Sequence, residues 1–233
     1  MSETMPLLLL PGLLCDRRLW LPQIAALADI ATPIVADLTR DDSFAGMARR
    51  VLAEAPPRFA LAGLSMGGYV AQEIMRQAPN RVTRLALLDT SARADTPEQS
   101  QRRRDLIALT ERGEFRGVTP RLLPYLIHAD RLGDTALVTI ITDMARAVGV
   151  EAFRRQETAI LARVDGRADL ARIAVPTLVL CGRDDRLTPP KLAEEMAALI
   201  PQAKLRLVDH CGHMTTLEEP ALVNDALRDW LLS

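Results

Sequence analysis

Short apolar runs alternate along the chain with stretches of helical periodicity. Six runs have the length of strands, and they span residues 7–10, 33–36, 59–62, 82–88, 176–181 and 204–208. Between the last two, Leu192, Met196 and Leu199 recur at helical spacing, which predicts an amphipathic helix. Apolar strands that alternate with helices are typical of a parallel sheet covered on both faces, with a ligand site at the carboxyl ends of the strands.

Two polar residues are expected to open helices near the start of the chain. Asp16 precedes a helical pattern that runs through Trp20, and Ser43 precedes another that passes Met47 and ends near residue 55. Side-chain oxygens of Asp and Ser accept hydrogen bonds from the free N–H groups of a first helical turn. The chain therefore marks helix starts as well as strands.

The region from about residue 91 to residue 173 breaks this alternation. It holds no convincing strand, and its pattern is helical. We expect residues 1–90 and 174–233 to form an α/β core, with 91–173 as a helical insertion after the fourth strand. An apolar stripe in the insertion should cover the sheet's catalytic edge or other inserted helices, because its exposure would be costly; it comprises Leu137, Ile140, Ile141 and Met144.

Composition and charge narrow the class of protein. Of the 233 residues, 48% are hydrophobic, and 29 Lys and Arg stand against 30 Asp and Glu. This balance gives no reason to expect a nucleic acid partner. The apolar stretch at residues 5–15 is too short and too interrupted by proline to span a membrane. Three cysteines at unrelated spacings form neither a disulfide nor a metal pattern, which favours the cytoplasm.

The sequence Gly63-Leu64-Ser65-Met66-Gly67 carries the first candidate chemistry. It joins the third apolar run to a helical pattern, so Ser65 is expected on a sharp turn with its hydroxyl exposed for attack. The following helix directs its positive end toward a developing oxyanion. The alternative is a loop serine that only caps this helix.

A nucleophilic serine needs a base and a group that orients the base. Asp184 and Asp185 follow the fifth strand, while His210 and His213 follow the sixth. Either acid and either histidine could serve on these grounds. The chain order Ser, Asp, His is that expected of α/β-hydrolases.

Four motifs together resemble the α/β-hydrolase superfamily, in particular small esterases related to 3-oxoadipate enol-lactonase and pimeloyl-ester esterases. They are the run at residues 7–13, the serine turn, the segment 182–185, and Gly212-His213 followed by residues 218–220. The resemblance covers nearly the whole chain. It implies an α/β-hydrolase fold of about six mostly parallel strands, with the insertion as a helical cap; the alternative for 91–173 is extra core helices.

The resemblance also selects among the candidates. It implies Ser65 as nucleophile, His213 rather than His210 as base, and Asp185 rather than Asp184 as orienter. Asp89, after the fourth strand, is a minor rival for the acid. The backbone N–H groups of Leu13 and Met66 are expected to form the oxyanion hole. His128 is expected in the cap, where it could face the pocket, and Cys15 and Cys211 are expected to be buried, inert thiols.

Two departures from the family pattern stand out. Pro11-Gly12 occupies the place where many relatives have His-Gly, while the expected oxyanion donor remains the backbone N–H of Leu13. We also expect the antiparallel hairpin that opens many relatives to be missing.

The activity implied is hydrolysis of a carboxylic ester or lactone with a small or medium apolar acyl group, without metal or cofactor. The expected partner is this small-molecule substrate. Other chemistries of the same triad remain open alternatives: C–C bond hydrolysis, perhydrolysis, acyl transfer and lyase activity. A non-catalytic small-molecule receptor is a further alternative from a different class.

Overall fold

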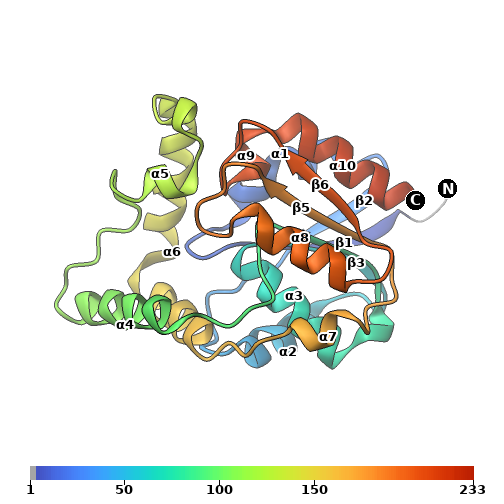
Figure 1. The fold of residues 1–233 in the computed structure, drawn as a ribbon, viewed down its shortest axis with the longest axis horizontal. Coiled ribbons are helices and arrows are strands. Elements are labelled where there is room, and N and C mark those ends of the chain that lie inside the picture. Colours follow the sequence, from blue (N-terminus) through green and yellow to red (C-terminus); the bar gives the residue numbers. More distant parts are fainter. Residues whose placement is uncertain (1–3) are drawn as a thin grey trace.

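One six-stranded parallel sheet forms the centre of the protein (Figure 1). The computed structural model describes residues 4–233. The strands lie in the order β2-β1-β3-β4-β5-β6 and span β1 Met5–Leu10, β2 Ala31–Val35, β3 Phe59–Leu64, β4 Val82–Leu88, β5 Thr177–Gly182 and β6 Lys204–Val208. The chain leaves β1 toward β2 on one side and returns to β3 on the other. The loops after β1 and β3 therefore diverge at the place where open α/β sheets bind ligands.

Helices cover both faces of the sheet. One face carries α1 (Leu21–Leu27), the short α9 (Thr215–Glu218) and α10 (Pro220–Leu232), and the other carries α2 (Phe44–Glu54), α3 (Met66–Gln77) and α8 (Pro190–Leu199). Short 3-10 helices η1 (Arg17–Trp20) and η2 (Pro79–Arg81) precede α1 and β4. Asp16 and Ser43 cap η1 and α2 through side-chain hydrogen bonds, as predicted.

The alternation of side chains along the strands divides the core into two clusters. In β1, Leu8 and Leu10 pack on the α2 and α3 side, while Leu7 and Leu9 pack toward α1 and α10. Because both faces are covered, the strand sequence is apolar without interruption, which is the pattern that predicted a buried parallel strand.

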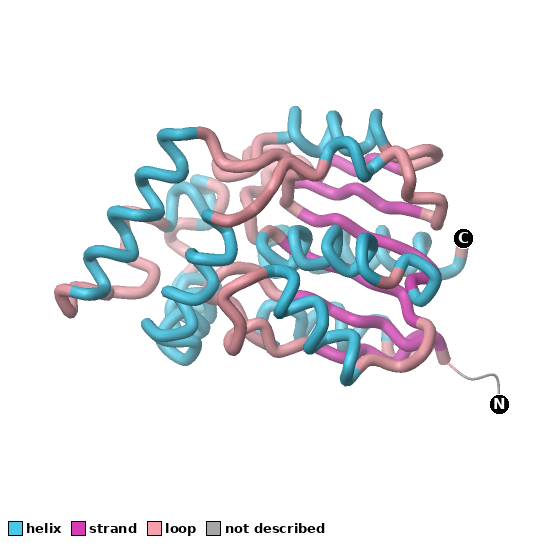
Figure 2. Tube along the Cα trace, turned by 90° about the horizontal axis from the view of Figure 1, so that it is seen from below, coloured by secondary structure: helices cyan, strands magenta, loops and turns pink. Residues whose placement is uncertain are grey.

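Between β4 and β5 the chain forms only helices within the described residues. They are α4 (Pro97–Glu111), α5 (Leu123–Leu126), η3 (Ala129–Arg131), α6 (Thr135–Leu161) and α7 (Arg167–Leu170). The long α6 bends at Gly149, whose φ of 77° interrupts the helical backbone. In Figure 2, α4, α5 and α6 lie beyond one end of the strands, while the start of β1 and the C-terminus lie at the other end. The insertion thus extends over the carboxyl edge of the sheet.

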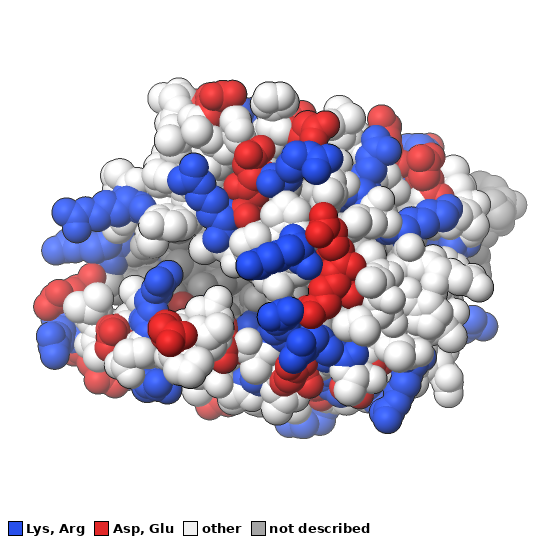
Figure 3. Space-filling model, viewed as in Figure 1, with Lys and Arg blue, Asp and Glu red and all other residues white. Residues whose placement is uncertain are grey.

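Buried ion pairs attach α4 to the second half of α6. Arg103 contacts Asp95 at 2.6 Å and Glu157 at 2.7 Å, and Arg163 contacts the other oxygen of Asp95 at 2.8 Å. The guanidinium of Arg163 also stacks over the ring of Tyr69 on α3. Elsewhere, Figure 3 shows positive and negative side chains intermingled over the visible face. These ion pairs therefore join segments of the insertion to one another, and the stacking of Arg163 on Tyr69 joins the insertion to the core.

The predicted six-stranded parallel sheet with its helical insertion is confirmed, and the bounds of β4 and β6 agree with the predicted runs. In the predicted apolar stripe, Leu137, Ile141 and Met144 are buried in the core cluster beside α1 and α10, but Ile140 is 38% exposed. No helix within residues 4–233 combines the length and the hydropathy needed to cross a membrane.

Candidate active site

Ser65 occupies the sharp turn between β3 and α3. Its backbone has φ of 54° and ψ of −116°, a conformation that residues other than glycine seldom adopt. A Cβ atom on Gly67 would overlap the carbonyl oxygen of Leu10 in β1, and one on Gly63 would overlap the backbone of Gly67. The two flanking glycines therefore permit the close approach of strand and helix. This close approach holds the backbone of Ser65 in its strained conformation at the turn.

The structure brings Ser65, His213 and Asp185 into one line of contacts. Oγ of Ser65 lies 2.9 Å from Nε2 of His213, and Nδ1 of His213 lies 2.8 Å from Oδ2 of Asp185. His213 and Asp185 are each only 3% exposed. Both distances are within the range of hydrogen bonds, so a proton can pass from the serine to an imidazole that the acid orients.

The loop after β5 fixes the carboxylate of Asp185. Oδ1 accepts hydrogen bonds from the N–H groups of Leu187 and Thr188, at 2.8 and 2.9 Å, and Oδ2 accepts one from the Thr188 hydroxyl at 2.6 Å. Burial alone would raise the pKa of Asp185, but the charge and hydrogen bond of His213 and the bonds from Thr188 hold it below its ordinary value. The acid is therefore ionised when it faces the imidazole.

The loop that carries His213 is held by a buried glutamate, Glu218. Its carboxylate accepts hydrogen bonds from the N–H groups of Gly212 and Met214, both at 3.1 Å, and from that of His128 at 2.6 Å. The N–H of His213 itself donates to the carbonyl of Leu126 in α5. Glu218 thus anchors the residues on both sides of His213, and the insertion anchors the backbone of His213 itself.

Burial and the neighbouring Asp185 act on the charge of His213 in opposite directions. Burial favours the neutral imidazole, but the negative charge and hydrogen bond of Asp185 prevail and raise the pKa of His213 above its ordinary value. Because Ser65 touches the opposite nitrogen, the neutral ring that donates from Nδ1 to Asp185 has Nε2 free to accept the serine proton.

The expected oxyanion donors border the serine. Leu13 lies in the loop after β1, and Met66 is the first residue of α3. Gly12 lies against the serine turn, since a Cβ atom there would be 3.5 Å from Cβ of Ser65. Within residues 4–233 neither the Leu13 nor the Met66 N–H donates to a protein acceptor. Neither amide is therefore already engaged, which is the condition that an oxyanion donor must meet.

His210 and Asp184, which competed with the triad residues in the sequence, gather outside the triad with His128, which was expected in the cap. His210 and Asp184 are exposed, and His128 is partly exposed. Nε2 of His128 lies 3.6 Å from Oδ2 of Asp184, and the rings of His128 and His210 meet edge to face with centroids 5.7 Å apart. The described contacts place none of the three against Ser65, so the structure pairs the serine with His213 alone.

Asp89 is a buried neighbour of the acid site. It is fully buried at the end of β4, where Oδ1 accepts from the N–H of Gly182 at 2.9 Å and Oδ2 meets the Thr215 hydroxyl. Burial and the nearby charge of Asp185 raise the pKa of Asp89 well above its ordinary value. Asp89 thus joins the loops after β4, β5 and β6, while Asp185 contacts the imidazole.

Two groups of side chains have donor atoms close enough for a metal ion, within 4.8 Å of one another in the described chain. In the buried group of Asp89, Cys181 and Asp185, both carboxylates already accept the hydrogen bonds given above. In the surface group of His128, Asp130 and His210, Nδ1 of His128 accepts from the N–H of Asp130. In each group at least one of the possible ligand atoms is therefore already engaged in a hydrogen bond.

The three cysteines carry free, buried thiols. Burial, together with the charge of Asp16, raises the pKa of the Cys15 thiol to about 12. Burial raises the pKa of Cys181 and Cys211 as well. A thiol kept protonated is a poor nucleophile, as expected for inert core cysteines.

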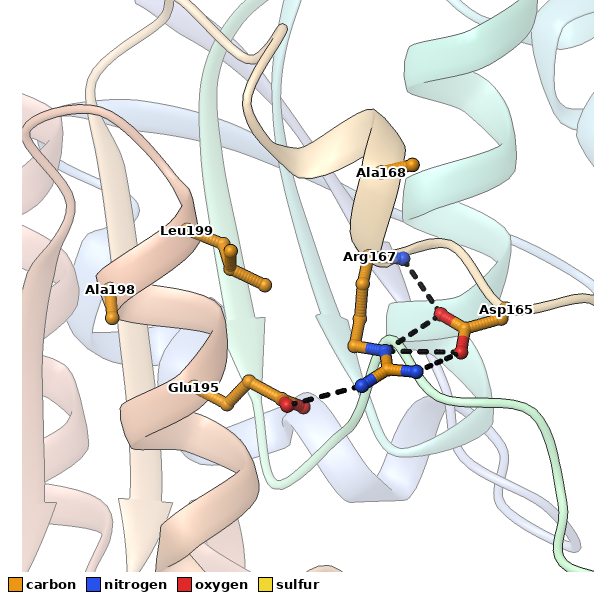
Figure 4. A pocket seen from close by; sticks show the side chains of 6 residues that line it. All are labelled: Asp165, Arg167, Ala168, Glu195, Ala198 and Leu199. Carbon is orange, nitrogen blue, oxygen red and sulfur yellow. Dashed lines mark hydrogen bonds and ion pairs between the residues drawn. The ribbon is translucent and has the colours of Figure 1, made fainter.

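A surface hollow lies away from these residues. It measures about 580 Å³ and lies between α7 and α8 (Figure 4). Its charged side chains neutralise one another, since Arg167 bonds Asp165 and lies 3.5 Å from Glu195. A second hollow of about 340 Å³ lies near the amino end of β5. No triad residue lines either hollow.

Comparison with known proteins defines the class. A family model of the alpha/beta hydrolase fold matches residues 32–220, and the chain belongs to this family. A pimeloyl-[acyl-carrier protein] methyl ester esterase of Nitrosomonas europaea is 30% identical over 195 residues, which cover 77% of this chain and 73% of the relative.

Solved structures agree with this assignment. A thermophilic esterase from Thermogutta terrifontis has a TM-score of 0.91 at 29% identity, over 100% of this chain and 91% of its own. The enol-lactonase from Burkholderia xenovorans LB400 shares the fold, with a TM-score of 0.90 at 24% identity over 100% and 93% of the two chains. The resemblance to esterases and to enol-lactonase predicted from the motifs is therefore confirmed at the level of family and fold.

Sequence reasoning missed three residues around the site. Glu218 falls within a motif named above and Thr188 lies three residues after another, but the sequence assigned neither of them a role. Gln156 was not noticed, although it shares helical spacing with Phe153 and Ile160, which are both buried. A polar residue in line with buried apolar ones is the signal that could have found it.

Proposed function

We propose that this protein is a serine hydrolase that cleaves a carboxylic ester or lactone through an acyl-enzyme, with Ser65 as nucleophile, His213 as base and Asp185 as orienter. The observation that carries the proposal is the continuous line of contacts from Ser65 Oγ through both nitrogens of His213 to Asp185. A loop serine that only caps a helix would not need a buried imidazole and carboxylate aligned behind it.

In the first half of the reaction, Ser65 Oγ attacks the carbonyl carbon while its proton moves to Nε2 of His213. Asp185 stabilises the imidazolium that results. The carbonyl oxygen becomes negative and accepts hydrogen bonds from the N–H groups of Leu13 and Met66, at the N-terminus of α3. When the C–O bond breaks, His213 returns the proton to the departing alkoxide, and the acyl group remains on Ser65.

In the second half, water takes the place of the alcohol. His213 accepts a proton from the water as its oxygen attacks the acyl carbon, and the same two N–H groups hold the second oxyanion. Collapse releases the carboxylic acid and returns the proton from His213 to Ser65. The residues need no metal or cofactor for either step.

Apolar side chains of the insertion support an apolar acyl group. Around Leu14, on the loop after β1, Ala145 and Phe153 are buried, and partly buried apolar residues pack against them: Leu13, Leu106, Phe115, Val118 and Val148. We propose residues 91–173 as a lid domain over the core of 1–90 and 174–233, whose apolar side chains select small or medium acyl groups.

The relatives support the reaction class. The Nitrosomonas methyl ester esterase and the Thermogutta esterase are both named as esterases, and they are 30% and 29% identical to this chain. A cytoplasmic location, which fits three free thiols, belongs to the same proposal.

The test combines covalent labelling with turnover. A fluorophosphonate should label one serine, and p-nitrophenyl esters of increasing acyl length, lactones and thioesters should show which substrates are hydrolysed. Catalytic turnover of the esters or lactones is the expected result. Labelling without turnover of any of them would instead indicate a receptor or another chemistry on the same triad.

A further inference from the structure

We propose that Gln156, on the second half of α6, is a positioning residue that holds the loop after β1 in the shape that presents the Leu13 N–H to the oxyanion. The proposal rests on the proposed function, since it concerns the oxyanion hole of that reaction. The new proposal extends the proposed function, because it makes the inserted helix α6 responsible for the shape of the oxyanion hole.

Gln156 is fully buried, and both ends of its amide bind backbone of the core. Its Oε1 accepts a hydrogen bond from the N–H of Leu14 at 3.1 Å, and its Nε2 donates to the carbonyl of Leu38 at 3.1 Å. The two partners follow β1 and β2, which are neighbouring strands. If α6 only covered the core, an apolar side chain at position 156 would suffice.

The bond to Leu14 acts next to the proposed oxyanion donor. Leu14 has φ of 58°, a left-handed conformation that is unfavourable for leucine, and the turn closes with a bond from the Cys15 N–H to the Gly12 carbonyl at 3.1 Å. Leu13 lies inside this turn. Because Leu14 is buried, its N–H would have no water to replace Gln156, so losing the side chain favours a different turn.

The departure from the family pattern at Pro11 lies three residues before this contact. Proline has no N–H and offers no side-chain hydrogen bond, so it cannot tie the loop through its own polar groups. In this chain the side-chain hydrogen bond to the loop comes from Gln156 of the insertion, 142 residues after Leu14.

The neighbouring Glu157 provides a matched control. It is also buried on α6, but it binds Arg103 of α4 and makes no hydrogen bond to the loop after β1. Glu157→Gln should weaken the attachment of α6 to α4 without touching Leu14. Gln156→Met keeps nearly the same volume and removes both hydrogen bonds.

The experiment measures ester hydrolysis and the binding of an aryl trifluoromethyl ketone, which forms a tetrahedral oxyanion on the serine. For Gln156→Met we expect kcat to fall by about 10- to 100-fold, less than the 10²–10³ of a fully lost oxyanion donor. KM should stay within about threefold, and the inhibition constant of the ketone should rise by a factor similar to the loss in kcat. Glu157→Gln should lower the melting temperature while kcat and ketone binding stay near wild type.

The proposal is overturned if folded Gln156→Met keeps kcat and ketone affinity within about threefold of wild type, or if Glu157→Gln lowers both to the same extent. Should Gln156→Met not fold, Gln156→Asn carries the same expectations, because its amide is one methylene too short to span both backbones. Failure of the proposed function itself is distinct, since the wild-type protein would then not turn over any ester.

Discussion

The backbone of Gly182 lies directly against that of Gly212. A Cβ atom on Gly182 would overlap the carbonyl oxygen of Gly212 and come within 2.9 Å of the carbonyl carbon of Cys211. Gly182 ends β5, three residues before Asp185, and Gly212 directly precedes His213. The contact therefore fixes the separation between the loop of the acid and the loop of the base.

The first prediction follows from this contact. Gly182→Ala should lower the free energy of unfolding by about 3 kcal/mol, because the atoms it meets are backbone and cannot rotate away. The folded fraction should also lose ester hydrolysis, since Asp185 and His213 are pushed apart. Urea denaturation and kcat measure the two effects. Gly133→Ala is the control, since a Cβ atom there meets nothing within 4 Å; equal effects of the two substitutions would contradict the prediction.

The second prediction separates two neighbouring acids. Asp185→Asn should lower kcat by about 10³- to 10⁴-fold, because an amide no longer fixes the tautomer of His213 or stabilises its charge. Asp184→Asn should change kcat by less than about threefold, since Asp184 is exposed and faces His128 instead. Steady-state kinetics on a p-nitrophenyl ester measures both. The reverse ranking would move the acid to Asp184.

The third prediction concerns pH. The pKa of His213 is raised by Asp185, and only the neutral ring can accept the serine proton. The acid limb of kcat/KM should therefore lie above the ordinary histidine pKa of about 6.5. The contribution of the charged His213–Asp185 pair to folding stability changes with pH in the opposite direction to activity. It is fully present below about pH 6.5 and is lost as the pH rises through the pKa of His213 in the folded protein.

The pH profile of kcat/KM, with an NMR titration of the His213 ring, measures this limb. His210→Ala should leave it in place, because His210 is exposed and does not contact the triad. An acid limb at or below pH 6.5 would show that Asp185 does not raise the pKa of the catalytic base.

The fold could be predicted from the sequence to a large extent, and the reason lies in local patterns. The strands 82–88 and 204–208 were predicted at their observed bounds because turn residues flank each run, and Ser43 marked a helix start through its own side chain. The order of Ser65, Asp185 and His213 along the chain, each after a strand, indicated that they share one edge of the sheet. Such signals involve residues close in sequence.

The remainder depends on contacts between distant residues. Glu218 binds the N–H of His128, 90 residues away, and Gln156 binds that of Leu14, so no local spacing reveals either bond. Periodicity placed Ile140 on the buried stripe with Ile141, but packing leaves Ile140 at its exposed border. Which polar groups meet across the core is determined by tertiary packing, which a single sequence does not encode locally.

The fourth prediction concerns acyl specificity. Phe115 packs against Phe153, with ring centroids 5.2 Å apart, beside the loop of Leu13 and Leu14. Phe115→Ala should open space there and raise the ratio of kcat/KM for long over short acyl chains by roughly tenfold, since one methylene in an apolar pocket is worth about 1–3 kcal/mol. Leu109→Ala, at an exposed position of α4, is the control. An unchanged length profile in Phe115→Ala would show that this part of the insertion does not select the acyl group.

The hydrolysis rate of the Ser65→Ala variant bears on the triad more directly than any other quantity. The variant should keep the fold, because the methyl group fits where the hydroxyl meets His213, and its melting curve checks this. We predict that kcat for a p-nitrophenyl ester falls by about 10⁴-fold or more, as for loss of a triad nucleophile. A rate within tenfold of wild type would contradict the role of Ser65 and, with it, the proposed acyl-enzyme.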